Sequence, residues 1–199
     1  MNFSRAYHTL RLWTIPSAYK RTNYLRKKHI FGAIGPGCTI TERKVPLYPQ
    51  LIRLGSNVRL AANVLFIPHD ITHKMLNMSI RRKKKAPWVP LVPEGQLFQE
   101  VVGCIQIGNN VFVGSNTTIL YDVKIGNNVI IGAGSLVNRD IPDNCVAAGV
   151  PARVICDMDT YIQKRLQMAH YPDEWKAEDQ KISPELVKWC WEEFERSRT

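Results

Sequence analysis

Residues 107–137 read IGNNVFVGSNTTILYDVKIGNNVIIGAGSLV, and this stretch decides the fold. An aliphatic side chain returns every six positions without a miss, and glycine follows it in four of the six repeats. Six consecutive aliphatic residues in one frame have a chance probability on the order of one in ten thousand, so the repeat is real. The repeated aliphatic residues are Ile107, Val113, Ile119, Ile125, Ile131 and Val137.

A period of six residues suits a short strand followed by a tight bend, in which glycine and asparagine tolerate left-handed backbone angles. Successive bends wind the chain into a coil, and stacked coils pair their strands above and below while aliphatic ladders fill a narrow prism. An earlier set in the same style runs through Leu54, Leu60 and Phe66, with a weaker start at Ile34 and Ile40. The sequence therefore predicts an all-β core of stacked parallel coils.

The periodic region is interrupted once and is flanked by helical patterns. Residues 70–104 break the period with charges and prolines, which predicts an excursion loop. Residues 158–170 and 183–196 have helical patterns, and the second begins with Ser183 as N-cap and Pro184 at the first helical position. We therefore expect three parts: a basic helical segment over residues 1–30, the coil over residues 31–156 and a helical extension over residues 157–199.

The positive charge lies almost entirely in the N-terminal part. Residues 1–85 hold 17 Lys or Arg against only Glu42 and Asp70, a net charge of +15, whereas seven basic and ten acidic residues follow from Asp157 onward. Such a balance indicates an anionic partner, either nucleic acid, membrane headgroups or a phosphorylated small molecule. No helix-turn-helix, zinc-finger or RNA-recognition signature is present, so nucleic acid is not expected.

Residues 1–30 contain no acid and interleave basic with aromatic side chains, a composition typical of a segment on an anionic membrane surface. The alternative is that Phe3, Tyr7, Leu10 and Trp13, which fall at helical spacing, pack against the prism or a neighbouring subunit. The basic residues are Arg5, Arg11, Lys20, Arg21, Arg26, Lys27 and Lys28, and the other aromatic residues are Tyr19 and Tyr24.

Other features of the sequence bear on the cellular location. The longest charge-free stretch is interrupted by polar residues, and the first thirty residues lack the apolar core of a secretory signal. The five cysteines are odd in number and widely spaced, which favours reduced thiols over disulfides or a zinc site. We expect a cytoplasmic protein, with the membrane contact of residues 1–30 as a peripheral one.

Three segments carry a resemblance to a known family. They are Ile107-Gly-Asn-Asn-Val-Phe-Val-Gly-Ser115, Ile125 through Pro142, and Ala147-Ala-Gly-Val-Pro-Ala-Arg-Val-Ile155. Over roughly residues 34–156 the chain resembles the hexapeptide-repeat acetyltransferases, in particular the galactoside and maltose acetyltransferases and the O-acetyltransferases of surface polysaccharides. The resemblance implies a left-handed parallel β-helix, a homotrimer with active sites between neighbouring subunits, and acetyl-CoA as the donor.

The resemblance also implies a catalytic histidine, which the family carries at the end of a coil just before an excursion loop. The matching residue is His69, whose imidazole would act as general base on an acceptor hydroxyl. His73 is a possible competitor, and the two histidines together could ligate a metal. Some proteins of this fold bind zinc through three histidines, yet no histidine lies between His73 and His170, so we expect no metal.

The family pattern assigns the coenzyme A contacts to six residues. The two arginines carry most weight, because the phosphates of the cofactor need cations. The alternative for Ala133 and Gly134 is that small residues are required by the bend alone. Phe112 stands where several family members have tryptophan, which leaves one wall of the site open to interpretation. The six residues are Ser115, Ala133, Gly134, Asn138, Arg139 and Arg153.

The residues that would bind the acceptor do not match those of the sugar acetyltransferases. Glu100 could orient His69 through a hydrogen bond or could be a solvated carboxylate. The basic run at residues 81–85 could bind a phosphorylated acceptor, the phosphates of coenzyme A or a membrane, or it could be a solvated loop tip. The sequence predicts an acetyl-CoA-dependent O-acetyltransferase that acts on a sugar or polysaccharide precursor. The alternatives are N-acetylation of an amino sugar, acetylation of serine or an antibiotic, and a non-enzymatic binding module.

Overall fold

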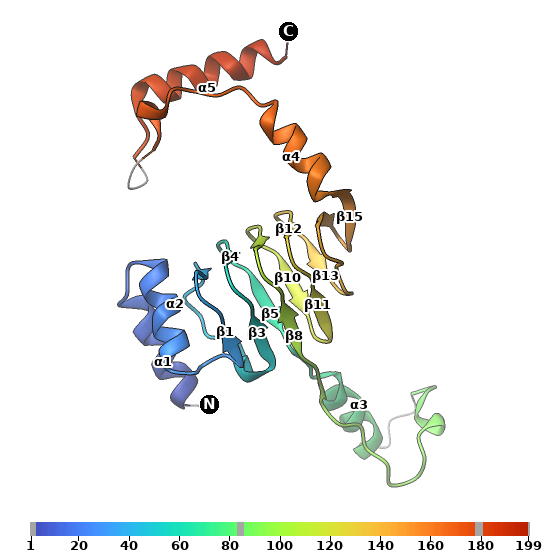
Figure 1. Ribbon diagram of the computed structural model, residues 1–199. Helices are drawn as coiled ribbons and strands as arrows, with labels where there is room; N and C mark the ends of the chain where they lie inside the picture. Colours follow the sequence, from blue (N-terminus) through green and yellow to red (C-terminus); the bar gives the residue numbers. More distant parts are fainter. Residues whose placement is uncertain (1–2, 83–85, 178–180, 199) are drawn as a thin grey trace. The chain divides into compact units, whose positions relative to one another are not determined.

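The computed structural model describes residues 3–82, 86–177 and 181–198. Part of the basic run, residues 83–85, lies outside the described residues. The chain divides into two compact units, residues 1–161 and residues 162–199, which are described separately below (Figure 1). Among the described residues, no helix is both long and apolar enough to cross a membrane.

The first unit is built on stacked coils of short strands. Consecutive strands of one coil join three different sheets in turn, and the next coil repeats the order, as β3, β4 and β5 are followed by β8, β9 and β10. The prediction of stacked parallel coils is confirmed. The coil strands are β1 (Ala33–Ile34), β2 (Thr39–Ile40), β3 (Ile52–Leu54), β4 (Val58–Leu60), β5 (Leu65–Ile67), β8 (Ile105–Ile107), β9 (Val111–Val113), β10 (Thr118–Leu120), β11 (Val123–Ile125), β12 (Val129–Ile131), β13 (Leu136–Val137), β14 (Cys145–Gly149) and β15 (Ala152–Asp157).

The three sheets run β1-β3-β8-β11, β2-β4-β9-β12-β14-β15 and β13-β10-β5. All neighbouring strands in them are parallel except β14 and β15, which form an antiparallel pair at the C-terminal end of the stack. The first coil supplies β1 and β2 but no strand to the third sheet. Residues 41–48 follow β2 without a strand and lead into a 3-10 turn, η1 (Pro49–Leu51), directly before β3. As a result, β5 is an edge strand.

The aliphatic repeat forms the core. Alternate residues of the coil strands point inward, so that in β8 and β9 the outer positions of each triplet are buried and the middle one is exposed. Parallel pairing sets like residues in register, for example Leu54 opposite Ile107. Each fully buried aliphatic side chain contributes about 1.5–3 kcal/mol through its removal from water. All six repeat positions from Ile107 to Val137 are at most 1% exposed.

An asparagine ladder lines one corner of the prism, between the first and second sheets. Four asparagines at equivalent turn positions have φ between 54° and 57°, the left-handed region that asparagine tolerates. The side-chain amide nitrogens of the first three donate to the side-chain oxygen of the asparagine in the next coil, at 3.1, 3.0 and 2.8 Å. The ladder therefore joins four coils through one column of side chains, which are Asn57, Asn110, Asn128 and Asn144.

The excursion between the coils contains more regular structure than a loop. It begins with β6 (His69–Asp70), continues through α3 (Thr72–Arg81) and a 3-10 turn, η2 (Val89–Leu91), and returns as β7 (Val101–Val102). None of the residues of α3 is buried, so this helix contributes nothing to the hydrophobic core. Antiparallel pairing of β6 with β7 closes the excursion at its base.

Two helices precede the coil, α1 (Phe3–Trp13) and α2 (Ala18–Lys27). Ser17 caps α2 by accepting a hydrogen bond from the Lys20 N–H, and α2 contacts β2. Figure 1 shows α1 and α2 beside the N-terminal end of the stack. The aromatic residues of α1 do not pack against the prism, because Leu12 alone of the α1 residues is buried. The other alternative, that they pack against a neighbouring subunit, stays a prediction.

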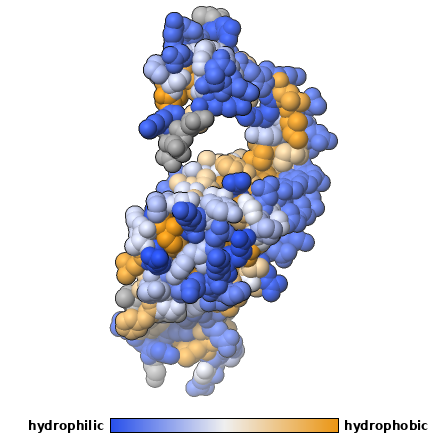
Figure 2. Space-filling model, turned by 60° about the vertical axis from the view of Figure 1, so that its left-hand side comes forward, coloured by the Kyte–Doolittle hydropathy of each residue, from blue (hydrophilic) through white to orange (hydrophobic). Residues whose placement is uncertain are grey.

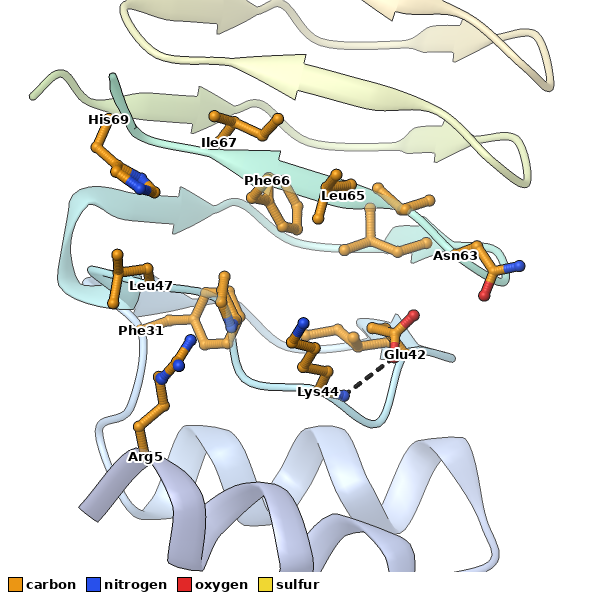
Figure 3. A pocket seen from close by; sticks show the side chains of 14 residues that line it. Arg5, Phe31, Glu42, Lys44, Leu47, Asn63, Leu65, Phe66, Ile67 and His69 are labelled. Carbon is orange, nitrogen blue, oxygen red and sulfur yellow. Dashed lines mark hydrogen bonds between the residues drawn. The ribbon is translucent and has the colours of Figure 1, made fainter. Parts of the chain in front are cut away.

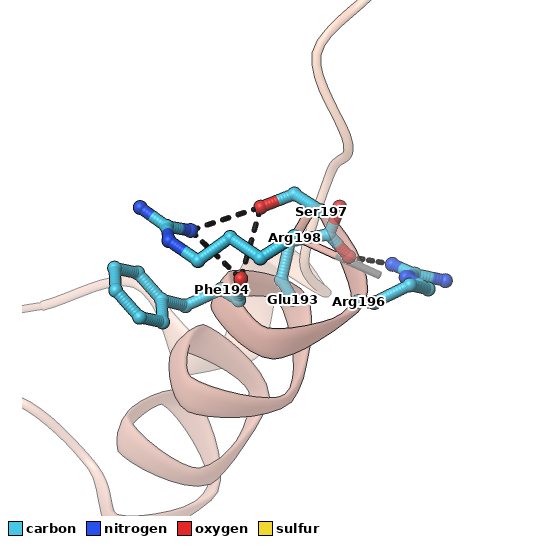
Figure 4. Close-up of polar contacts among 5 residues, drawn as sticks. All are labelled: Glu193, Phe194, Arg196, Ser197 and Arg198. Atoms are coloured by element: carbon cyan, nitrogen blue, oxygen red, sulfur yellow. Dashed lines mark hydrogen bonds and ion pairs between the residues drawn. The ribbon is translucent and has the colours of Figure 1, made fainter.

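The second unit consists of the end of α4 (Met158–Leu166), a 3-10 turn, η3 (Asp173–Trp175), and α5 (Pro184–Arg196). The helix predicted over residues 158–170 ends at Leu166. The predicted start of α5 is confirmed, since Ser183 Oγ accepts from the Leu186 N–H at 3.1 Å. At its other end, Arg198 stacks over the ring of Phe194 and donates to the Phe194 carbonyl (Figure 4).

Candidate active site

His69 stands where the third sheet gives way to the excursion. It follows Pro68 directly after β5, and as the first residue of β6 it lies opposite Val102 of β7. The Gly103 N–H donates to the Pro68 carbonyl at 3.0 Å, so both ends of the excursion are tied together at this point. The backbone that carries the imidazole is therefore fixed by pairing, although it belongs to an excursion.

The imidazole packs against Tyr48. The two ring centroids are 5.4 Å apart and the rings meet edge to face, with an interplanar angle of 81°. The Tyr48 hydroxyl donates to the Glu100 carboxylate, at 3.1 Å to Oε1 and 3.3 Å to Oε2. This hydrogen bond raises the pKa of Tyr48 above its ordinary value, so the hydroxyl stays protonated at neutral pH. Tyr48 itself is held in the left-handed region, with φ of 49°.

Glu100 therefore contacts Tyr48 rather than His69. The hypothesis that a carboxylate hydrogen-bonds the imidazole directly finds no such bond among the described residues. His69 Nδ1 is buried and has no hydrogen-bond partner in the described part of the chain, and the same holds for Nδ1 of His73 on α3. Buried polar atoms are nearly always hydrogen-bonded in folded proteins. His69 Nδ1 can therefore form a hydrogen bond with a group other than the described residues.

Asp70 adds a negative charge next to His69. Its carboxylate accepts a hydrogen bond from the Thr72 N–H at 2.6 Å. That hydrogen bond, helped by the nearby imidazoles of His73 and His69, lowers the pKa of Asp70 below its ordinary range. The Asp70 carboxylate therefore stays charged at neutral pH beside the His69 imidazole.

A cavity of about 580 Å³ opens beneath β5 and reaches His69 (Figure 3). It exists because the first coil has no strand in the third sheet, so the edge of β5 is not covered by another strand. Its walls are mainly apolar, and five polar side chains also line it. The polar residues are Arg5 from α1, Glu42 and Lys44 from the segment after β2, Asn63 and His69.

Five of the six residues expected to contact coenzyme A form two groups on the third sheet, and the sixth, Arg153, lies on β15 of the second sheet. Ser115, Ala133 and Gly134 lie in the turns that precede β10 and β13, where the Gly134 N–H donates to the Ser115 carbonyl at 2.8 Å. The two turns are therefore neighbours. Gly134 has φ of 70° and open space where a Cβ would stand, so the bend requires its backbone angle and the surface beside it is accessible.

Asn138 and Arg139 belong to the second group, because they follow β13 at its other end. His69 follows β5 at the same end, and β10 lies between β5 and β13, so two strand spacings of about 5 Å separate the two positions. Arg153 lies on β15 opposite Ala148, and its guanidinium donates to the Ala152 carbonyl at 2.7 Å. Both arginines are exposed.

Comparisons with known proteins now decide the family. Residues 104–139 match the family model described as bacterial transferase hexapeptide (six repeats). The chain is 40% identical over 134 residues to protein CapG of Staphylococcus aureus, covering 67% of this chain and 69% of that protein. The chain belongs to the hexapeptide-repeat acetyltransferase family. The family and the acyltransferase class predicted from the sequence are confirmed.

Two solved structures of acetyltransferases are also similar to this hexapeptide-repeat protein. A maltose O-acetyltransferase from Clostridium difficile 630 is 26% identical, with 77% of this chain and 86% of that chain covered and a TM-score of 0.49. A galactoside acetyltransferase in complex with coenzyme A is 26% identical, with 90% and 92% covered and a TM-score of 0.47.

Within the described residues of this hexapeptide-repeat acetyltransferase, no three His, Cys, Asp or Glu side chains lie together as metal ligands would.

The sequence does not predict Tyr48 as a neighbour of His69. Tyr48 lies in the segment that replaces the missing strand of the first coil, where the six-residue period is lost. No periodic signal marks such a residue, and only the folded chain brings it to the imidazole.

Proposed function

We propose that the chain is an acetyl-CoA-dependent O-acetyltransferase that acts on a hydroxyl of a sugar or polysaccharide precursor, with His69 as general base. The observation that carries this proposal is the imidazole itself, which lines a cavity and keeps a buried ring nitrogen without a partner among the described residues. Membership of the family supports acetyl transfer, and the galactoside acetyltransferase structure with coenzyme A supports the donor.

The reaction requires a base that removes the proton of the acceptor hydroxyl. A neutral hydroxyl is a weak nucleophile towards a thioester, so His69 accepts its proton as the oxygen bonds to the acetyl carbonyl carbon. The carbon–sulfur bond then breaks, and the coenzyme A thiolate leaves and takes the proton from the imidazolium. Tyr48 packs against the imidazole and is itself held by its hydrogen bond to Glu100, so the ring keeps its place during the reaction.

For the donor, we propose that Ser115, Ala133 and Gly134 contact the pantetheine arm and that Asn138, Arg139 and Arg153 contact the phosphates. The exposed guanidinium groups of the two arginines suit phosphate oxygens, which they can bind through two parallel hydrogen bonds. We further propose that the coil is left-handed, as the family resemblance implies, and that three chains share their active sites.

Three chains of 22.8 kDa give a trimer of about 68 kDa. Closed cyclic symmetry would place the same face of each chain against its neighbour, and the exposed donor residues would then lie in clefts between chains. Light scattering tests the assembly. A stable monomer with full activity would contradict active sites shared between chains.

For the acceptor, we propose the cavity beneath β5, since it is the hollow that reaches His69. Arg5, Lys44 and Asn63 offer hydrogen-bond donors, and the apolar walls suit the carbon face of a ring. The same cavity could hold an amino sugar, which would make the enzyme an N-acetyltransferase. Analysis of the product, which carries the acetyl group on oxygen or on nitrogen, distinguishes the two reactions.

The experiment is a thiol-release assay with acetyl-CoA against sugars, nucleotide sugars, amino sugars, serine and aminoglycoside antibiotics. We expect acceptor-dependent release of coenzyme A with one class of sugar hydroxyl. Mass spectrometry of the product then locates the acetyl group on oxygen or nitrogen. No thiol release with any acceptor, from a protein that binds acetyl-CoA, would favour a binding module over an enzyme.

A further inference from the structure

Helix α1 presents a largely exposed stripe of three aromatic residues and one leucine. Its four members recur at helical spacing on one side of the helix, and each is at least 63% exposed. On the face drawn in Figure 2, hydrophobic residues lie in patches among hydrophilic ones. We call this surface the α1 stripe, which consists of Phe3 (85% exposed), Tyr7 (63%), Leu10 (69%) and Trp13 (66%).

The opposite side of α1 is committed to the fold. Leu12 is 1% exposed, and a His8 ring nitrogen lies 2.7 Å from the Tyr24 hydroxyl of α2. Arg5 lines the cavity that reaches His69, as Figure 3 shows. Since these contacts fix the rotation of the helix, the α1 stripe must point away from the coil.

The surroundings of the α1 stripe are basic. The guanidinium carbon of Arg43 lies 5.4 Å from the centroid of the Trp13 ring, and Arg11 is exposed on the same helix. Two lysines of α2 and the lysine that follows it are exposed as well. Residues 1–69 contain a single acid, Glu42, whose carboxylate already accepts two backbone N–H groups. The exposed lysines of α2 and its end are Lys20, Lys27 and Lys28.

Not every basic residue of this region is available to a partner. Arg21 is 3% exposed and donates to the carbonyls of Ile15, Pro16 and Thr41, so its charge is used within the fold. Arg26 donates to the side chain of Asn23. Arg43 is half-buried and donates to the carbonyls of Leu12, Trp13 and Ile15. The exposed cations of α1, α2 and the residue after α2 are therefore Arg11 and the three lysines named above.

We propose that the α1 stripe and these cations form a binding surface for an anionic lipid membrane. Aromatic side chains favour the membrane–water interface, and amphipathic helices with basic flanks lie in that plane. Each Lys or Arg held near an anionic surface strengthens binding about fivefold. The same surface of a second chain would be a poor partner. Its cations would repel those of the first chain, and residues 1–69 of each chain contain only one acid, Glu42, to offset the repulsion.

The surface also has a structural link to the candidate active site. α1 carries the stripe on one side and Arg5, which lines the cavity, on the other. A membrane bound to the stripe would therefore lie close to the acceptor cavity, which suits a lipid-linked glycan as acceptor. This link rests on the proposed function, whereas lipid binding itself does not.

The test is co-sedimentation of the full chain, without acetyl-CoA, with phosphatidylcholine vesicles and with vesicles that contain about 30% phosphatidylserine. We expect binding to the anionic vesicles alone and its loss at about 0.5 M NaCl, where screening shortens electrostatic interactions to a few ångströms. Leu10→Glu should weaken binding at least about tenfold, because it removes an inserting side chain and adds a charge that the lipid repels.

Matched controls exist elsewhere in the chain. Leu91→Glu makes the same change at a residue that is 81% exposed, and Trp191→Ala on α5, 62% exposed, matches Trp13→Ala. The two controls should bind within about twofold of wild type, and Trp13→Ala should bind several-fold more weakly. Circular dichroism checks that all four variants are folded.

Three results would overturn the proposal. The first is the absence of wild-type binding to anionic vesicles at low salt, and the second is equal binding by the stripe variants and their controls. The third is a change of molar mass in light scattering with Leu10→Glu but no change in vesicle binding, which would assign the stripe to a second copy of the chain. None of these results depends on whether the protein transfers acetyl groups.

Discussion

The asparagine ladder makes a prediction whose magnitude can be worked out from one residue. Asn128 has φ of 54°, donates to Asn144 at 2.8 Å and accepts from Asn110 at 3.0 Å. Asn128→Ala removes both hydrogen bonds and forces an ordinary L-residue into the left-handed region. That region costs about 1–2 kcal/mol for a residue with a Cβ. Each lost bond adds about 0.5–1.5 kcal/mol, with the lower end appropriate to a partly exposed site.

The sum predicts that Asn128→Ala lowers the free energy of unfolding by about 2–4 kcal/mol. Asn128→Gly loses the same two bonds but adopts the left-handed angle without strain, so it should cost about 1–2 kcal/mol. The difference between the two variants isolates the backbone contribution.

Urea unfolding followed by far-ultraviolet circular dichroism measures both values at one protein concentration, so that any assembly equilibrium is held constant. Equal midpoints for the alanine and glycine variants would refute the assigned role of the left-handed angle. A midpoint of Asn128→Ala within error of wild type would refute the ladder as a stabilising feature.

Three further predictions concern the site and the coil. Tyr48→Ala should lower turnover several-fold while Tyr48→Phe, which keeps the ring against His69, should lower it less; steady-state kinetics with equal losses in both would contradict a positioning role for the ring. Arg139→Ala and Arg153→Ala should each raise the KM for acetyl-CoA about tenfold and leave turnover nearly unchanged, and an unchanged KM in both would remove them from the donor site. Two hydrogen bonds from Asn127 lower the pKa of Asp143, so this carboxylate contributes stability above its ordinary pKa that is lost as pH falls through the lowered value. Asp143→Asn should therefore flatten the loss of stability below about pH 4 in acid titrations, and an unaltered acid limb would contradict the assignment.

The sequence predicts the coil well because the coil is a local pattern repeated. Each buried aliphatic residue and each Asn in a turn recurs at a fixed interval, so the period alone indicates which residues point inward. The Ser183 N-cap is equally local, since its side chain and the N–H that it binds lie three residues apart.

The site is harder to predict because it forms where the period fails. Tyr48 and Glu100 are 52 residues apart and belong to segments without repeats, yet their hydrogen bond defines one side of His69. The cavity exists because one strand is missing from the first coil, and a missing strand has no sequence signature. The sequence does not decide between the two roles of α1 for a related reason, since only packing around Leu12 shows which side of the helix faces outward.

The central claim is that His69 acts as the base in acetyl transfer from acetyl-CoA. The most direct measurement compares turnover of the wild type, His69→Ala and His73→Ala with the best acceptor from the thiol-release panel. His73 is the matched control, because its Nδ1 is also buried without a described partner but it does not line the cavity. The account predicts that His69→Ala lowers turnover by about 10²- to 10⁴-fold with little change in the KM for acetyl-CoA, and that His73→Ala stays within about threefold of wild type. Near-wild-type turnover in His69→Ala would contradict the claim.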